Sequence, residues 1–271
     1  MKLRKYFTVL LIALTVVVIG SSLALAADQN VLERILDRGE IIVGTDASIK
    51  PLSFTSSETD EVEGFIPDLA KLYAKKLGVK IKIRDFSWSG LFPALETGKI
   101  DLIAANITTT IPRTAKLGFV EPWLFTGACA LVRKDAPYKS LKELNSEDVT
   151  FGQTKGSYYV ETVQKDFPRA KVKKFESLAE WVQALLTKRI DVVIDDELVI
   201  KLSALQGNED KLKVIPENYM PQTYRWSANI EDTHLRKSLD IFFQEIKITG
   251  EYAEIYKKWM KEDWQPKVIG F

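Results

Sequence analysis

The chain has 271 residues, of which 46% are apolar and 28% are charged, with one Cys, one His and six Trp. This composition is ordinary for a water-soluble globular protein and excludes a disordered chain, a collagen-like repeat and a disulfide scaffold. One Cys and one His leave no zinc cluster. Because 38 basic residues stand against 37 acidic ones, no cationic surplus favours nucleic acid as a partner.

The first 26 residues have the pattern of a secretory signal peptide. Lys2, Arg4 and Lys5 give a basic start, residues 7–19 form an apolar or weakly polar run, and residues 24–26 are small enough for cleavage. A retained membrane anchor is the alternative, but the run is shorter than the roughly 20 residues that span a bilayer. We therefore predict a periplasmic or extracellular protein, secreted through a cleavable signal peptide at 1–26.

Short apolar runs alternate with helical patterns along the first part of the mature chain. The helix around Pro67 has a proline in its first turn, apolar residues on one face and a stop at Gly78. Strands that alternate with helices are typical of a parallel sheet covered by helices. The expected strands are 41–44, 79–84 and 101–104, and the expected helices are 67–77 and 89–97.

The same order returns in the second half of the chain. Residues 94–103 and 184–193 match at five of ten positions, 90 residues apart, although chance or a shared helix–strand pattern also explains such a match. The sequence thus predicts two similar α/β units. In the second unit the expected strands are 150–153, 171–175 and 191–194, and the expected helices are 157–166 and 177–187.

Polar side chains follow the last strand of each unit. Asn106, Thr108 and Arg113 come after the first of these strands, and Asp195 and Asp196 after the second. Ligands of open α/β sheets bind just beyond the carboxyl ends of the strands, so we expect both groups to line one cleft. A cation and hydroxyls on one wall and carboxylates on the other are complementary to the zwitterion of an α-amino acid.

In this interpretation Arg113 holds the ligand carboxylate through two parallel charge-assisted hydrogen bonds, which a lysine cannot reproduce. Thr108 adds a hydroxyl and a backbone N–H, and Asp196 takes the ammonium. Exposed ion pairs contribute only about 0–1 kcal/mol, so the cleft must close and exclude water. In the alternative, Arg113 caps or pairs on a solvated helix and Asp196 is a helix N-cap.

Several motifs, in the right order, resemble those of the family 3 extracellular solute-binding proteins, the amino-acid receptors of ABC importers. The resemblance covers nearly the whole mature chain. The five-residue step from Asp191 to Asp196 also fits the family. The other matching segments are GFIPDLA at 64–70, WSGLFPAL at 88–95, TTTIPR at 108–113, FVEPW at 119–123, GSY at 156–158 and residues 250–259.

The resemblance implies a type II periplasmic-binding-protein fold with two lobes, each a central mixed, mostly parallel sheet flanked by helices. Lobe 1 would combine 27–130 with 225–271, and lobe 2 would be 133–219. The chain would cross between the lobes near 126–133 and 216–224 and would close by a hinge around its ligand. The expected protein is a monomer that captures a polar or basic L-amino acid and delivers it to the permease of an ABC transporter.

The resemblance also assigns roles at the ends of the bound ligand. Arg113, Thr108 and the turn at Ser157 and Tyr158 would hold the carboxylate, while Asp196 and Thr108 would hold the ammonium.

Three further positions belong to the implied site. Trp88 would stack on the ligand, Asp46 would meet a polar or cationic side-chain end, and Asn106 would lie nearby. Each has a plainer alternative: Trp88 in the core, Asp46 in a turn, and Asn106 satisfying backbone groups. Ile49 and Leu52 depart from the family because aromatic residues are usual there, which leaves one side of the customary aromatic sandwich missing.

Two other functions stay open on the sequence. Residues 32–36 and 259–264 are also similar to cyclohexadienyl (arogenate/prephenate) dehydratase, an enzyme of this fold, whose general acid is a Glu at the position of Val199. Asp195 and Glu197 lie beside Asp196, but neighbouring residues are expected to point elsewhere. The third function is a ligand-binding sensor that reports to a membrane receptor. The chain has no nucleophile elbow, phosphate loop or dinucleotide fingerprint, so we expect no cofactor and no enzyme activity.

Overall fold

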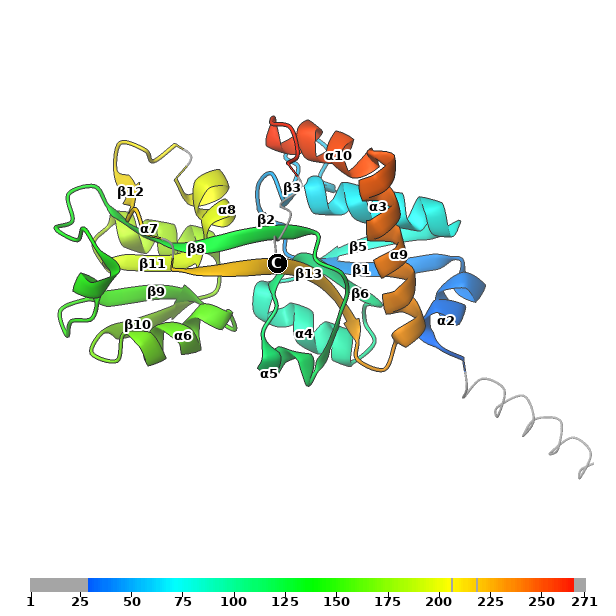
Figure 1. The fold of residues 1–271 in the computed structure, drawn as a ribbon, viewed down its shortest axis with the longest axis horizontal. Helices are drawn as coiled ribbons and strands as arrows, with labels where there is room; N and C mark the ends of the chain where they lie inside the picture. Colours follow the sequence, from blue (N-terminus) through cyan, green and yellow to red (C-terminus); the bar gives the residue numbers. More distant parts are fainter. Residues whose placement is uncertain (1–28, 206, 218, 266–271) are drawn as a thin grey trace, which may run out of the picture.

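The computed structural model describes residues 29–205, 207–217 and 219–265, so the predicted signal peptide lies outside the described residues. Two α/β lobes stand side by side and share one ten-stranded sheet (Figure 1). The main strand order is β10-β9-β11-β8-β13-β6-β1-β5, with β12 beside β8 and β7 beside β13. Within these ranges no helix has both the length and the apolar character needed to cross a membrane.

The first lobe is built on β1, which pairs in parallel with β5 on one side and β6 on the other. Helix α3 ends at Gly78 as predicted. Gly78 has a left-handed backbone conformation, and its N–H donates to carbonyl groups of the last helical turn. The elements of this lobe are α2 (Val31–Arg38), β1 (Glu40–Thr45), β2 (Ser48–Ile49), β3 (Ser53–Thr55), β4 (Val62–Glu63), α3 (Phe65–Leu77), β5 (Lys80–Asp85), α4 (Trp88–Glu96), β6 (Leu102–Thr108), α5 (Ile111–Thr114), β7 (Leu117–Phe119), α9 (Thr233–Thr249) and α10 (Glu251–Met260).

The second lobe repeats this arrangement around β9, which pairs in parallel with β10 and β11. All the predicted strands and helices of both lobes are present, with ends that differ by a few residues. The elements here are η1 (Leu141–Leu144), β9 (Thr150–Thr154), α6 (Tyr158–Asp166), β10 (Lys171–Phe175), α7 (Leu178–Leu186), β11 (Val192–Asp196), α8 (Glu197–Val199), η2 (Ile200–Ala204) and β12 (Leu212–Val214).

Two long antiparallel strands connect the lobes: β8 (Leu124–Arg133) and β13 (Met220–Asn229). They pair with each other from Met220 to Tyr224, after which β8 pairs with β11 in the second lobe and β13 with β6 in the first. The predicted crossings at 126–133 and 216–224 overlap these strands. The lobe boundaries and the hinge itself stay predictions.

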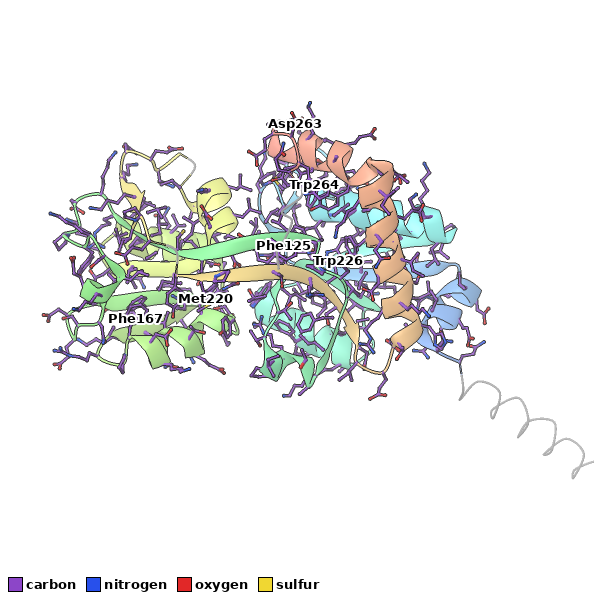
Figure 2. All side chains as sticks on the ribbon, in the orientation of Figure 1. Phe125, Phe167, Met220, Trp226, Asp263 and Trp264 are labelled. Carbon is purple, nitrogen blue, oxygen red and sulfur yellow. The ribbon has the colours of Figure 1, made fainter. Side chains whose placement is uncertain are left out.

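Helices cover both faces of the sheet in each lobe. In the first lobe α3, α9 and α10 lie on one face and α4 on the other; in the second, α7 and α6 take these places (Figure 1). Each face has its own buried cluster. Trp226 belongs to a core of the first lobe, whereas Phe167 and Met220 pack in the second (Figure 2). Each lobe therefore has buried clusters of its own, although Val199 of the second lobe also packs in a first-lobe cluster.

The two similar sequence fragments adopt the same local structure. Each follows the end of a helix with a left-handed residue, Gly98 in one and Lys188 in the other, and then enters a strand. The shared aspartate has one task in both: Asp101 accepts from the N–H of Ile42 at 2.7 Å, and Asp191 from that of Thr150 at 3.0 Å. These carboxylates fix the start of the last strand of each unit, which carries the polar residues that follow it.

Candidate functional site

One pocket between the lobes is lined by all eight residues singled out from the sequence. About 520 Å³ of space, part of it open to solvent, lies between its walls. Both lobes contribute at the carboxyl ends of their strands, as the open-sheet rule predicts. The predicted residues in the lining are Asp46, Trp88, Asn106, Thr108, Arg113, Ser157, Tyr158 and Asp196.

Arg113 lies on the short helix α5, which Thr110 caps by accepting from the Arg113 N–H at 3.3 Å. Its guanidinium donates from Nη1 to the carbonyl of Thr108 (3.0 Å) and from Nη2 to that of Gly156 (3.3 Å). Burial lowers the pKa of Arg113, and the charge of Asp196 opposes that shift. Since a guanidinium has five N–H donors, three are left to hold an anion in the pocket.

The carbonyl of Gly156 joins the two lobes. It accepts from Nη2 of Arg113 and from Nε1 of Trp88, both at 3.3 Å, so two first-lobe side chains converge on one second-lobe atom. Gly156 has φ +76, a conformation that side chains rarely adopt. Trp88 is 9% exposed, belongs to a core cluster with Leu91 and also lines the pocket; its stacking on a ligand stays a prediction.

Asp195 and Asp196 lie together at the end of β11. The N–H of Asp196 donates to Oδ1 of Asp195 at 2.7 Å, and the hydroxyl of Tyr159 donates to Oδ1 of Asp196 at 2.8 Å. Poor hydration in the pocket raises the pKa of Asp195 to about 7. Burial raises the pKa of Asp196 as well, and the neighbouring charge of Asp195 adds to that rise. A bound cation would stabilise the ionised form of both.

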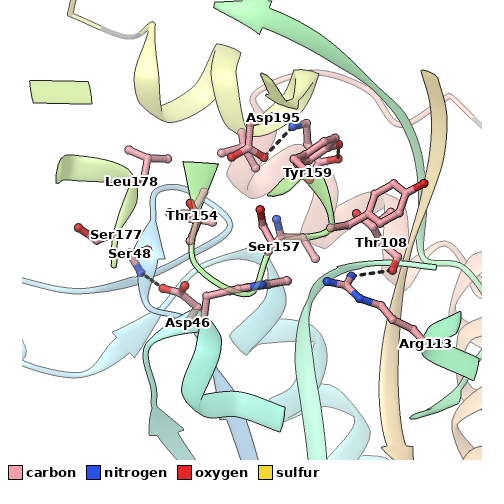
Figure 3. Close-up of a pocket in the computed structure, with 16 residues that line it drawn as sticks. Asp46, Ser48, Thr108, Arg113, Thr154, Ser157, Tyr159, Ser177, Leu178 and Asp195 are labelled. Carbon is pink, nitrogen blue, oxygen red and sulfur yellow. Dashed lines mark hydrogen bonds between the residues drawn. The ribbon is translucent and has the colours of Figure 1, made fainter. Parts of the chain in front are cut away.

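Asp46 lies on the opposite side of the pocket from Arg113, with Ser157 between them (Figure 3). Its Oδ1 accepts from the N–H of Ser48 at 3.1 Å, which is a turn contact, yet the carboxylate also faces the pocket. Burial raises the pKa of Asp46. The position of Asp46 fits a group at the far end of a ligand whose carboxylate lies at Arg113.

Asn106 and Ser157 add two more polar groups to the lining, and the Tyr224 hydroxyl lies behind it. Asn106 is 7% exposed and lies near the hydroxyl of Tyr224, which is buried beside Asp196 without a hydrogen bond of good geometry. The hydroxyl of Ser157 is buried, lines the pocket and has no partner among the described residues. A buried hydroxyl without a partner is costly, so a polar ligand atom beside Ser157 would remove a penalty.

Asp195 and Asp196 both line the pocket, as expected from their place after a strand. The separate expectation that Asp195 points elsewhere than Asp196 is wrong, because at the end of β11 the chain turns into α8 and both aspartates reach the pocket. Of the two departures from the family, Ile49 forms an apolar part of the lining, while Leu52 is buried in the core. Val199 also lines the pocket.

Several lining residues were missed by sequence reasoning. Some had an available signal, since Tyr159 follows the predicted GSY turn and Ser177 begins a predicted helix. Others depend on pairings that only the fold reveals. The missed residues are Ser48, Thr154, Tyr159, Ser177 and Leu178. Among the described residues no group of three or more His, Cys, Asp or Glu is placed to hold a metal ion.

Comparison with known proteins agrees with this fold. The ABC transporter glutamine-binding protein GlnH of Bacillus subtilis (strain 168) is 27% identical, over 96% of this chain and 99% of that protein. The crystal structure of the ancestral amino acid-binding protein AncCDT-1, a precursor of cyclohexadienyl dehydratase, is 31% identical with a TM-score of 0.77, over 85% of this chain and 99% of that one. An ancestral arginine-binding protein bound to arginine is 33% identical with a TM-score of 0.74, over 82% and 98% of the two chains.

The two lobes and the polar pocket between them define a binding protein of the type II periplasmic class. Residues 41–262 match the bacterial extracellular solute-binding proteins, family 3, and the chain belongs to that family.

Proposed function

We propose that this protein captures a cationic L-amino acid between its lobes and delivers it to an ABC importer. The observation that carries the proposal is the charge of the pocket: three carboxylates, those of Asp46, Asp195 and Asp196, face a single guanidinium, that of Arg113. A lysine or arginine ligand brings two positive groups and one negative group. The α-ammonium would meet the adjacent Asp195 and Asp196, the side-chain cation would meet Asp46 and the ligand carboxylate would meet Arg113, whereas a neutral side chain would leave Asp46 without a cationic partner.

The ligand would lie with its carboxylate on the free N–H groups of Arg113 and on the Ser157 hydroxyl. Its ammonium would meet Asp196, and its side chain would pass Trp88 towards Asp46. Figure 3 supports this order, because Asp46 and Arg113 stand at opposite sides of the pocket. The aliphatic part of the side chain would lie against Ile49 and Trp88.

Hinge closure, export and transporter docking complete the proposal. The ligand bridges Arg113 on the first lobe and Asp196 on the second, so it favours the closed state by contacts that an open state lacks. Family membership supports an extracytoplasmic site of action and a membrane permease as partner. We propose that the chain acts as a monomer and is exported by the segment at 1–26.

A thermal-shift screen of the twenty amino acids tests the ligand class, since a ligand that binds only the native state raises its melting temperature. L-arginine or L-lysine should give the largest shift. A largest shift with an acidic or aliphatic amino acid would contradict the charge argument.

Asp46→Asn tests the side-chain end of the site. We expect L-arginine to bind about tenfold to a hundredfold more weakly, because a charged hydrogen bond is lost, and L-glutamine to change by less than about threefold. The control is Asp148→Asn, which removes the same charge from an exposed position on the second lobe. Equal losses for both ligands, or for both variants, would oppose this role for Asp46.

We also propose that the chain binds its ligand without transforming it. Val199 presents an apolar side chain at the position where the resemblance to the dehydratase calls for a general acid. Formation of phenylpyruvate from prephenate would contradict this.

A further inference from the structure

A continuous chain of buried hydrogen bonds runs from the first lobe through a connecting strand into the second. The hydroxyl of Thr108 donates to Oε1 of Gln222 at 2.8 Å, and Nε2 of Gln222 donates to the hydroxyl of Tyr159 at 2.6 Å. That hydroxyl donates in turn to Oδ1 of Asp196 at 2.8 Å. All four residues are less than 10% exposed.

The position of Gln222 is what makes this chain unusual. It lies on β13 opposite Thr126 of β8, where the two lobe-connecting strands pair, and it does not line the pocket. Thr108 belongs to β6 of the first lobe, while Tyr159 and Asp196 belong to α6 and β11 of the second. One amide on the connecting strand thus links two residues of the pocket that stand on different lobes.

When Asp196 is ionised, the donors and acceptors along this chain of hydrogen bonds can be arranged in only one order. The hydroxyl of Tyr159 has a single proton, which it gives to Asp196, and burial together with the nearby negative charge raises the pKa of Tyr159 so that it keeps that proton. Tyr159 must therefore accept from Gln222, and the amide NH₂ must face it. The amide oxygen then faces Thr108, whose hydroxyl proton is committed to Gln222.

This order of donors and acceptors decides what Thr108 can offer a ligand. With its proton engaged, Oγ1 of Thr108 presents only lone pairs to the pocket, so it accepts from an ammonium and does not donate to a carboxylate. Hydrogen bonds in such a chain also strengthen one another, which makes this oxygen a better acceptor. Oδ1 of Asp196 is occupied by Tyr159, and the buried hydroxyl of Tyr224 lies beside the same carboxylate, so the ammonium would meet the acceptor sites of Asp196 that remain.

We propose that Gln222 is a positioning residue that sets the polarity of the ammonium subsite, acting through Thr108 on one lobe and through Tyr159 and Asp196 on the other. This inference rests on the proposed amino-acid function. A bound ammonium that donates to Thr108 and Asp196 closes the chain into a ring across both lobes. Gln222 thereby couples binding of the α-ammonium to the paired strands that connect the two lobes.

The test is the variant Gln222→Met, which keeps the length of the side chain and removes both polar groups. Titration calorimetry compares L-arginine with 5-guanidinopentanoate, which has the same guanidinium and carboxylate but no α-ammonium. We expect the variant to weaken L-arginine about tenfold and 5-guanidinopentanoate less than threefold, since one hydrogen-bonded contact to a charge is misaligned. Equal weakening of both ligands, or of neither, would overturn the proposal.

A second comparison needs only L-arginine and applies if the analogue binds too weakly to titrate. The double variant Thr108→Val with Gln222→Met should lose less affinity than the product of the two single losses, because one of the two arms through which Gln222 acts is already gone in Thr108→Val. Independent, multiplying losses would refute the assignment.

The matched control is Gln153→Met. Gln153 is a fully buried glutamine on β9 whose amide atoms both have no partner among the described residues. This substitution removes a buried amide that takes no part in the hydrogen-bond chain, and it should leave affinity for L-arginine unchanged. Failure of the proposed function itself is separable: wild-type protein would then bind none of the twenty amino acids.

Discussion

At the scale of single residues, the adjacent carboxylates of Asp195 and Asp196 dominate the electrostatics of the pocket. Both have a raised pKa, chiefly because the pocket walls keep water away. A group whose pKa is higher in the folded state than in the unfolded state stabilises the fold at low pH, and this stabilisation is lost as the pH rises through the folded value. In the ligand-free protein at neutral pH, ionisation of these buried carboxyl groups therefore lowers the free energy of unfolding.

Asp195→Asn tests this loss of stability, because it removes one of the two ionisable groups. The amide oxygen can still accept from the N–H of Asp196, but it carries no charge. Between pH 4 and pH 7, the range from the usual pKa of Asp195 to its raised value of about 7, the variant should gain stability relative to wild type. One unit of pKa shift corresponds to about 1.4 kcal/mol. Urea unfolding of both proteins across this range measures the difference, and a constant difference would oppose a raised pKa at Asp195.

Proton release should accompany ligand binding for the same reason. A cationic ligand beside Asp195 and Asp196 favours their ionised forms and lowers both pKa values, so binding near pH 6 should expel protons and affinity should rise towards pH 8. Titrations of L-arginine in buffers of different ionisation enthalpy measure the number released. The same binding enthalpy in every buffer at pH 6 would count against this coupling.

At the scale of elements, the turn before α6 holds the lobes together through the Gly156 carbonyl. Gly156→Ala places a side chain at φ +76 and should cost about 1–2 kcal/mol of stability. The new methyl group would lie 3.5 Å from Cβ of Ser89, an ordinary contact, so backbone strain and not a clash is the cause. Because that strain shifts the carbonyl shared by Trp88 and Arg113, affinity for L-arginine should also fall.

Gly98→Ala is the control for this variant. Gly98 has φ +66 and open space around it, so it carries the same backbone penalty far from the contact between the lobes. Thermal unfolding should show similar destabilisation for both variants, while calorimetry shows weaker binding only for Gly156→Ala. Unchanged affinity in both would mean that the contacts of the Gly156 carbonyl do not support ligand binding.

The elements themselves could be predicted because each leaves a local signal in the chain. Gly78 ends a helix with a left-handed residue, and the shared Ile-Asp step at 100–101 and 190–191 starts a strand in both lobes. The pocket could be predicted only as far as strand ends and family motifs reach. Gln222 could not be found, because its role depends on the pairing of β13 with β8 and β6, which no local pattern encodes. The side-by-side approach of Asp195 and Asp196 likewise depends on how β11 turns into α8.

At the scale of the whole molecule, two lobes joined by two long strands favour rigid-body closure. L-arginine should therefore reduce the radius of gyration of wild-type protein in small-angle X-ray scattering, because the closed state is more compact. Asp196→Asn, which weakens the bridge between lobes, should need far more ligand for the same change. An identical radius with and without saturating ligand would oppose hinge closure.

The central claim is that Arg113 and Asp196 bind opposite ends of one small zwitterion from different lobes. Titration calorimetry of L-arginine into wild type, Arg113→Ala and Asp196→Asn tests it directly, with circular dichroism to check that each variant is folded. We predict a clear binding isotherm for wild type and at least a hundredfold loss in each variant, because each leaves a charged ligand group unpaired in a buried site. Wild-type affinity in either folded variant would contradict the account.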